Sequence, residues 1–198
     1  MVPLMPAAET SALPLFPLHN VLLPGAAMGL RVFERRYLDL VRESGRNGTS
    51  FGVCLILDGT EVGAPATPAA FGTEVRIEDF DVGADGVLVL RSRGTRRFHV
   101  QRSRIRHNGL VVGEVHWCEP DSDDELRPEH SLLATLLERM LEQVGGEFAS
   151  VGPGLLDQAA WVGWRLAELL PLTEQQRLLL LQQDDPHQRL DQVLAWMP

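Results

Sequence analysis

Residues 85–117 read DGVLVLRSRGTRRFHVQRSRIRHNGLVVGEVHW, and this stretch decides the fold class of the first part of the chain. Two hairpin signals, Asp85-Gly86 and Asn108-Gly109, stand between apolar runs. The runs predict strands over residues 87–90, 98–105 and 110–117, with a turn at Gly94-Thr95. Turns this short join antiparallel neighbours, so the stretch predicts an antiparallel sheet.

The same pattern extends towards the N-terminus. Residues 13–18 and 51–57 are apolar runs that predict strands, and a further strand is expected after Phe71-Gly72-Thr73. Between them, apolar residues recur at helical spacing from Phe33, which predicts one helix that ends before the glycine at 45. About six strands and one helix are closed most economically as a small β-barrel.

The remainder of the chain has helical periodicity. One apolar stripe follows Pro128 and ends at Gly145-Gly146, and a second helix is expected over about residues 155–170. Thr173 with Gln176 has the pattern of a capping box, and Asp185-Pro186 begins a last helix. The fold class is therefore α+β, with a barrel followed by a four-helix bundle.

Charge divides the chain at the same place. Residues 1–118 hold 13 arginines and 12 acids, whereas residues 119–198 hold 5 arginines and 15 acids. We expect a flexible tail over 1–12, a barrel subdomain over 13–119, an acidic linker over 120–127 and a helical subdomain over 128–198. The acidic second part should repel nucleic acid and anionic membranes.

Composition excludes several mechanisms. The net charge is −9, and all 18 basic residues are arginine, so neither a P-loop lysine nor a Ser-Lys dyad is present in the sequence. Two cysteines, Cys54 and Cys118, indicate neither a zinc site nor a disulfide scaffold. No signal peptide or membrane-spanning segment is expected, which favours a reducing cytoplasm.

No catalytic or metal-binding motif occurs, so we expect no enzyme activity, no cofactor and no metal. The densest charged feature is a group of seven arginines within sixteen residues, namely Arg91, Arg93, Arg96, Arg97, Arg102, Arg104 and Arg106. One interpretation is a docking surface for phosphates or peptide carboxylates. The other is a solvent-facing side of a sheet, with the arginines paired to Glu74, Glu78, Asp79 and Asp81 on a neighbouring strand.

Several segments in a fixed order carry a resemblance to a known family. They are Leu13-Pro14-Leu15-Phe16-Pro17-Leu18, Leu23-Pro24-Gly25, Leu30-Arg31-Val32-Phe33-Glu34-Arg35-Arg36-Tyr37, Phe51-Gly52-Val53, Phe71-Gly72-Thr73, Gly94-Thr95-Arg96-Arg97-Phe98, Leu170-Pro171-Leu172, Gln175-Gln176, Leu179-Leu180 and the stretch from Asp185 through Arg189-Leu190 to Leu194. Over roughly residues 13–197 the sequence resembles the N-terminal substrate-recognition domain of Lon proteases, in the free-standing bacterial form.

The resemblance implies a PUA-like barrel followed by a helical bundle. It also implies a non-catalytic recognition module that lacks the ATPase and Ser-Lys peptidase parts of a full-length Lon protease. Its expected partner is unfolded polypeptide or another protein, in cytoplasmic quality control, with the oligomeric state left open. The candidate peptide-binding residues are Phe33, Arg35, Arg36 and Tyr37 on the first helix, together with Arg102 and Arg104 on the arginine-rich strand.

Two other functions remain open. PUA-like barrels often bind RNA, and such binding would weaken steeply with salt, although the net charge counts against it. A small-molecule sensor is the third possibility, because a pocket between barrel and bundle could hold a ligand.

Overall fold

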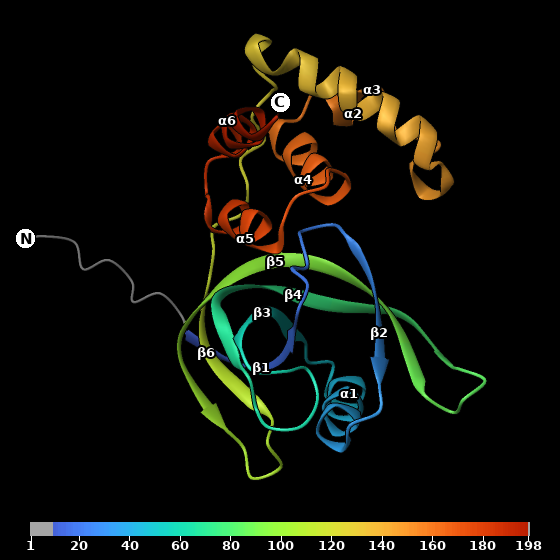
Figure 1. The fold of residues 1–198 in the computed structure, drawn as a ribbon, viewed down its shortest axis with the longest axis vertical. Helices are drawn as coiled ribbons and strands as arrows, with labels where there is room; N and C mark the ends of the chain where they lie inside the picture. Colours follow the sequence, from blue (N-terminus) through green and yellow to red (C-terminus); the bar gives the residue numbers. More distant parts are fainter. Residues whose placement is uncertain (1–9, 198) are drawn as a thin grey trace, which may run out of the picture. The chain divides into compact units, whose positions relative to one another are not determined.

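A computed structural model describes residues 10–197 of the chain. These residues divide into two units, one ending at Cys118 and the other beginning at Glu119. The first unit carries the strands and one helix, and the second carries the remaining helices, so the α+β fold class is confirmed (Figure 1).

Six strands and one helix build the first unit. They are β1 (Thr10–Leu18), β2 (Ala27–Val32), α1 (Arg35–Asn47), β3 (Phe51–Asp58), β4 (Thr67–Val82), β5 (Leu88–Ile105) and β6 (Val111–Trp117). The sheet order is β2-β5-β4-β3-β1-β6, and an additional β5–β6 pairing closes five of the strands into a ring. Closure leaves β2 outside the ring, paired only with β5.

Inward-facing apolar side chains fill the ring. A buried cluster is formed by Leu13, Leu15, Cys54, Phe98, Val111 and Val115. Phe98 is fully buried, and Gly52 and Gly72 both lie so close to its ring that a Cβ on either would overlap it. The glycines therefore let neighbouring strands pack against a large central side chain.

The strands differ from the expected set in two ways. β2 was not expected, whereas β5 is one continuous strand through the turn expected at Gly94-Thr95. Gly94 is needed for close approach instead, because a Cβ there would lie 2.4 Å from the carbonyl oxygen of Leu23. The count of six strands was thus right although its members were not.

One strand pairing and two element boundaries also differ from those expected from the sequence. β1 pairs with β3 in parallel, so the barrel is not wholly antiparallel. β1 begins at Thr10, inside the segment expected to be a flexible tail, and residues 1–9 of that segment lie outside the described residues. α1 continues to Asn47 and ends at Gly48, whose φ of 62° is left-handed, rather than before Gly45.

Helices make up the second unit. They are the 3-10 turn η1 (Pro128–His130), α2 (Ser131–Val144), the 3-10 turn η2 (Gly146–Phe148), α3 (Pro153–Leu156), α4 (Ala159–Leu169), α5 (Glu174–Gln182) and α6 (Pro186–Trp196). The four expected helices correspond to α2, α4, α5 and α6, and the single turn α3 precedes α4 as a separate element. Thr173 and Gln176 form the expected capping box at the start of α5.

The acidic segment that opens this unit is not a free linker. Leu126 and Ala159 donate backbone hydrogen bonds that tie the segments around Asp124 and Asp157 together. Asp121 accepts hydrogen bonds from Trp164 and Arg189, of which Arg189 is almost completely buried. The expectation of a solvated linker was therefore wrong for Asp121, which is part of the packing of the helical unit.

Candidate functional site

An apolar recess of about 310 Å³ opens in the first unit. It is lined by Phe16, Leu18, Asn20, Met28, Gly29, Leu30, Arg31, Phe33, Glu34, Tyr37, Glu61 and Val62. These residues come from the end of β1, from β2, from the start of α1 and from the loop after β3. The recess therefore lies where the one helix of the unit meets the strands.

Aromatic side chains form the inner wall of the recess. The Phe16 and Tyr37 rings stack with centroids 4.0 Å apart and planes 13° apart. The ring of Phe51, which does not itself line the recess, lies 6.2 Å from that of Phe16. All three are buried, which fixes their positions before any ligand arrives.

Two apolar side chains line the recess and remain exposed. Phe33 is 54% exposed and Val62 is 53% exposed, although both are large and hydrophobic. Exposed apolar groups beside a concave apolar wall are typical of binding sites for apolar ligands.

Local sequence explains how the helix contributes to this wall. Glu34 precedes the helix in an extended conformation, and the first turn then carries Arg36 and Tyr37 inward. Arg36 is buried, pairs with Glu34 at 3.1 Å and donates to the carbonyl oxygen of Gly109 at 3.2 Å. Arg36 thus fixes the helix to the 108–110 turn and is not presented to a ligand.

The charged residues that line the recess, Arg31, Glu34 and Glu61, have partners within the chain. Arg31 pairs with Asp85 at 2.5 Å, and a carboxylate oxygen of Glu61 accepts a hydrogen bond of 2.8 Å from the backbone of His19. Burial raises the pKa of Tyr37, with Arg36 opposing that shift and Glu34 adding to it. The phenol is therefore neutral at physiological pH, and the site suits apolar side chains rather than an anion.

A second hollow, of about 910 Å³, lies beside β4 in the same unit. The guanidinium of Arg96 lies 3.4 Å from the centre of the Trp117 ring and pairs with Glu74 at 2.8 Å. Burial acts to raise the pKa of Glu74, but hydrogen bonds from Arg96, Ser50 and Thr95 outweigh it and lower that pKa. Arg96, Ser50 and Thr95, which line this hollow, are thus already engaged by Glu74.

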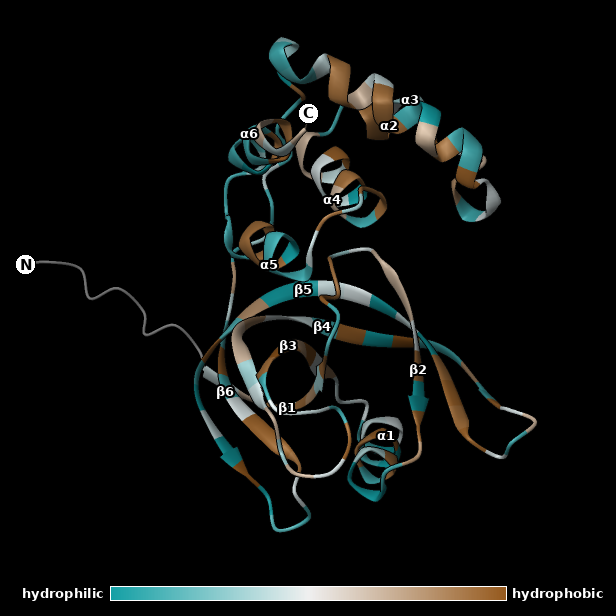
Figure 2. Cartoon of the chain, viewed as in Figure 1, coloured by the Kyte–Doolittle hydropathy of each residue, from teal (hydrophilic) through white to brown (hydrophobic). Residues whose placement is uncertain are grey.

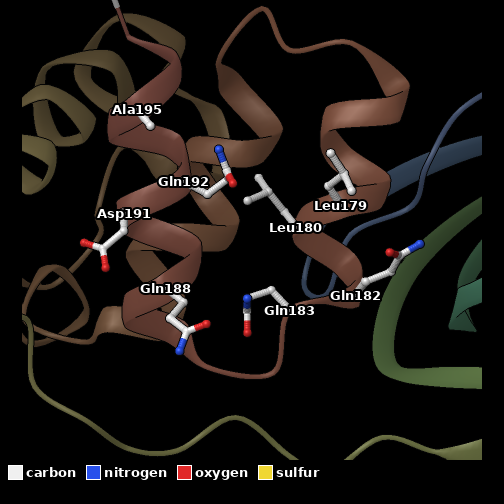
Figure 3. Close-up of a pocket in the computed structure, with 8 residues that line it drawn as sticks. All are labelled: Leu179, Leu180, Gln182, Gln183, Gln188, Asp191, Gln192 and Ala195. Carbon is white, nitrogen blue, oxygen red and sulfur yellow. The ribbon is translucent and has the colours of Figure 1, made fainter.

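A third hollow, of about 540 Å³, lies between α5 and α6 in the helical unit. Figure 3 shows the amide side chains of Gln183, Gln188 and Gln192 directed into this space, while Asp191 points away from it. Asp191 instead meets the Nε2 atom of His130 at 2.7 Å. Within residues 10–197, no group of three or more His, Cys, Asp or Glu side chains could hold a metal ion.

Comparison with known families adds the decisive observation. Residues 12–198 match the family described as the ATP-dependent protease La (LON) substrate-binding domain. The chain belongs to this family.

Solved structures agree with that assignment. The chain is similar to a Lon N-terminal domain protein from Xanthomonas campestris, with 76% identity and a TM-score of 0.83, covering 95% of this chain and 99% of that one. The N-terminal domain of Mycobacterium avium complex Lon protease is 15% identical with a TM-score of 0.67, covering 94% of this chain and 97% of that one, and supports the fold alone. Comparison with curated proteins gave no match.

The resemblance found in the sequence is thus confirmed, and the structure shows how the expected LON binding residues are placed. Phe33 and Tyr37 line the apolar recess together, whereas Arg36 is buried in an ion pair. Arg35 is exposed but does not line the recess. The predicted residues therefore do not form one site.

Arg102 and Arg104 are exposed near the far end of β5 and line none of the three hollows. Arg102 approaches Glu114 on the neighbouring strand at 3.9 Å. Neither arginine lines the apolar recess, so within the described residues they belong to a different surface of the LON barrel.

The arginine-rich strand follows the paired interpretation in part. Arg93 pairs with Glu78 at 2.6 Å and Arg96 with Glu74 at 2.8 Å, as that interpretation expects. In the part of the chain that the structure describes, neither Asp79 nor Asp81 forms an ion pair. Arg97 is buried, so it does not face a ligand either.

Sequence reasoning missed several lining residues of the LON recess. Met28 and Leu30 belong to β2, where alternation with Val32 was a signal that could have revealed the strand. Val62 lies in a loop rich in glycine and proline, where no periodic pattern marks a residue that returns to the recess.

Proposed function

We propose that this LON substrate-binding domain recognises unfolded polypeptide by taking apolar side chains into the recess beside Phe33. The single observation that carries the proposal is the exposure of Phe33 and Val62 next to a wall of stacked, buried aromatic rings. The recess volume of about 310 Å³ gives room for one or two large apolar side chains. Such a site favours hydrophobic segments without reading a defined sequence.

The family supports the same role. A substrate-binding domain of a protease engages protein substrates, and the recess offers no nucleophile with an adjacent base. We therefore propose a non-catalytic recognition module that acts in protein quality control. A cytoplasmic setting is supported by the two cysteines, which are both free thiols.

The test measures binding of a fluorescently labelled, permanently unfolded polypeptide to the whole chain by anisotropy. Phe33→Ser should weaken binding by about tenfold, which corresponds to about 1.4 kcal/mol. Ile105→Ser is the matched control, because Ile105 is 61% exposed in the same unit but does not line the recess. Unchanged affinity in Phe33→Ser, or equal losses in both variants, would refute the proposal.

RNA binding remains the alternative, and its test differs. Arg93 and Arg96 are engaged by Glu78 and Glu74, which leaves fewer guanidinium groups for phosphates. Binding of single-stranded RNA that falls steeply with salt, and that survives Phe33→Ser, would favour the alternative over peptide recognition.

A further inference from the structure

The outer edge of β4 is open over residues 76–82. β3 pairs with β4 only as far as Phe51 opposite Val75, and beyond that point β4 pairs with β5 on its other side alone. No other strand among the described residues, 10–197, pairs with this edge. The β4–β5 hairpin projects from the barrel (Figure 1), so its outer edge is a free template for a further strand.

Apolar side chains continue across the hairpin to this edge. Phe80 lies opposite Leu90, which lies opposite Leu30 on β2, and Leu30 and Leu90 are buried. Phe80 itself is 69% exposed, and Val82, two residues along the strand, is also largely exposed. In Figure 2 the hydrophobic colouring of this hairpin lies mainly on the arm that begins β5. The apolar rows of the sheet thus end at an edge that no further strand covers in the described chain.

Two carboxylate side chains of β4 occupy backbone N–H groups of this edge. Asp79 accepts a hydrogen bond of 2.9 Å from the backbone N–H of Phe80, and Asp81 accepts one of 2.7 Å from that of Val82. These two carboxylates therefore occupy donors that a neighbouring strand would use. Negative charge on an edge strand also repels strands that carry the same charge.

The charges of the neighbouring acids are already balanced. Glu78 pairs with both Arg93 and Arg76, and Asp85 pairs with Arg31. Asp79 and Asp81 form no ion pair within the described residues, although Arg91 lies opposite Asp79 in the strand register. Residues 76–82 hold one arginine and three acids, so this edge strand is negative, and the acids without an ion pair in the described chain, Asp79 and Asp81, lie beside Phe80 and Val82.

Charge complementarity selects the occupant. A second copy of this chain, paired antiparallel through β4 with Phe80 opposite Phe80, would place Asp79 of each copy opposite Asp81 of the other, which is unfavourable. We propose that residues 76–82 form a docking edge for an extended, basic polypeptide segment of a partner protein. Its apolar residues would cover Phe80 and Val82, and its Lys or Arg residues would draw the two carboxylates from the backbone.

Binding of such a segment would conserve the hydrogen bonds of the two N–H groups at this edge. When Asp79 and Asp81 turn to the partner's cations, the N–H groups of Phe80 and Val82 become available to the partner's carbonyl oxygens. A segment without basic residues would leave the carboxylates on those N–H groups and the edge closed. None of residues 76–82 lines the recess, so this docking edge goes beyond the proposed function.

The test uses the whole chain and a synthetic peptide of alternating lysine and valine, with a glutamate–valine peptide as control. We expect saturable binding of the lysine peptide alone, weakened by salt. Binding should also slow amide hydrogen exchange at Phe80 and Val82, because their N–H groups enter a new ladder. Binding of both peptides with equal affinity would overturn the proposal.

Two variants test whether binding depends on the charges of this edge and whether it is independent of the recess. Asp79→Asn with Asp81→Asn keeps an oxygen on each N–H and removes both charges, so the lysine peptide should bind at least about tenfold more weakly. Phe33→Ser in the recess should leave this binding unchanged, which distinguishes failure of the docking edge from failure of the proposed function. Unaltered affinity in the double Asn variant, or dimerisation of the free chain through this edge, would overturn the proposal.

Discussion

The indole Nε1 of Trp164 donates a hydrogen bond of 2.6 Å to the carboxylate of Asp121, 43 positions earlier in the chain. Arg189 contacts both residues. Its guanidinium lies 4.0 Å from the centre of the Trp164 ring and also donates a hydrogen bond to Asp121. One carboxylate therefore connects the opening segment of the helical unit to α4 and α6.

Replacing Asp121 should destabilise the helical unit. Asp121→Ala leaves the buried Arg189 without its carboxylate, and loss of one member of such a pair costs about 3 kcal/mol. We expect a lower midpoint in urea, measured by tryptophan fluorescence. Asp123→Ala is the control, because Asp123 is exposed in the same segment and should change the free energy of unfolding by less than about 0.5 kcal/mol. Equal effects of the two substitutions would contradict this role of Asp121.

Glu74 should make the stability of the barrel depend on pH. Its pKa is lowered in the folded chain, so ionised Glu74 contributes stability that is present above its ordinary pKa of 4.5 and is lost as the pH falls through the folded value. Glu74→Gln should therefore cost about 1 kcal/mol at neutral pH, and the difference from the unaltered chain should shrink below about pH 4.5.

Denaturant titrations over a pH series measure this difference. Glu114→Gln serves as the comparison, because Glu114 is half exposed and approaches Arg102 only at 3.9 Å. A Glu74→Gln cost that stays constant from neutral to acidic pH would contradict the assignment of the lowered pKa.

Gly72 should tolerate no side chain. A Cβ there would lie 2.5 Å from the carbonyl oxygen of Val53 and 2.6 Å from the Phe98 ring. We expect Gly72→Ala to lower stability by about 1–3 kcal/mol, in line with overpacking of a core. Gly29→Ala has nothing within 4 Å of the new methyl group, so thermal unfolding of the two variants should differ by several degrees. Similar melting temperatures would show that the barrel can shift to accept the methyl group at 72.

The two thiols should differ in reactivity. Cys54 is fully buried, and burial raises its pKa far above the ordinary value, whereas Cys118 is half-buried. A thiol reagent added to the native chain should modify Cys118 first, and Cys54 should react only when urea unfolds the barrel. Peptide mapping of the modified chain gives the readout, and early labelling of Cys54 would indicate that the barrel opens locally.

Local patterns in the sequence predicted much of the fold. The hairpin at Asn108-Gly109 and the capping box at Thr173 depend on neighbouring residues, and both are present. β2 was missed because Met28 and Leu30 lie in a run of only six residues, directly after a turn signal. The parallel pairing of β1 with β3 depends on contacts between distant segments, which no local pattern encodes.

The candidate site was predicted less completely for a similar reason. Phe33 and Tyr37 lie four positions apart, at the spacing of one helical turn, so the sequence could group them although Phe33 precedes the first residue of α1. Arg36 stands between them in sequence, but its burial depends on Glu34 and on Gly109, 73 positions away. Likewise, the role of Asp121 depends on Arg189, so a string of acids in the sequence could not be distinguished from a solvated segment.

Closure of the ring has a consequence for biosynthesis. Trp117 on β6 donates a hydrogen bond to Ser11 on β1, 106 positions earlier, and β6 is synthesised last among the six strands of the described sheet. At a translation rate of roughly 5–20 residues per second, β6 is synthesised on the order of 5–20 s after β1. During this interval the nascent chain exposes the kind of apolar segment that we propose the finished protein binds.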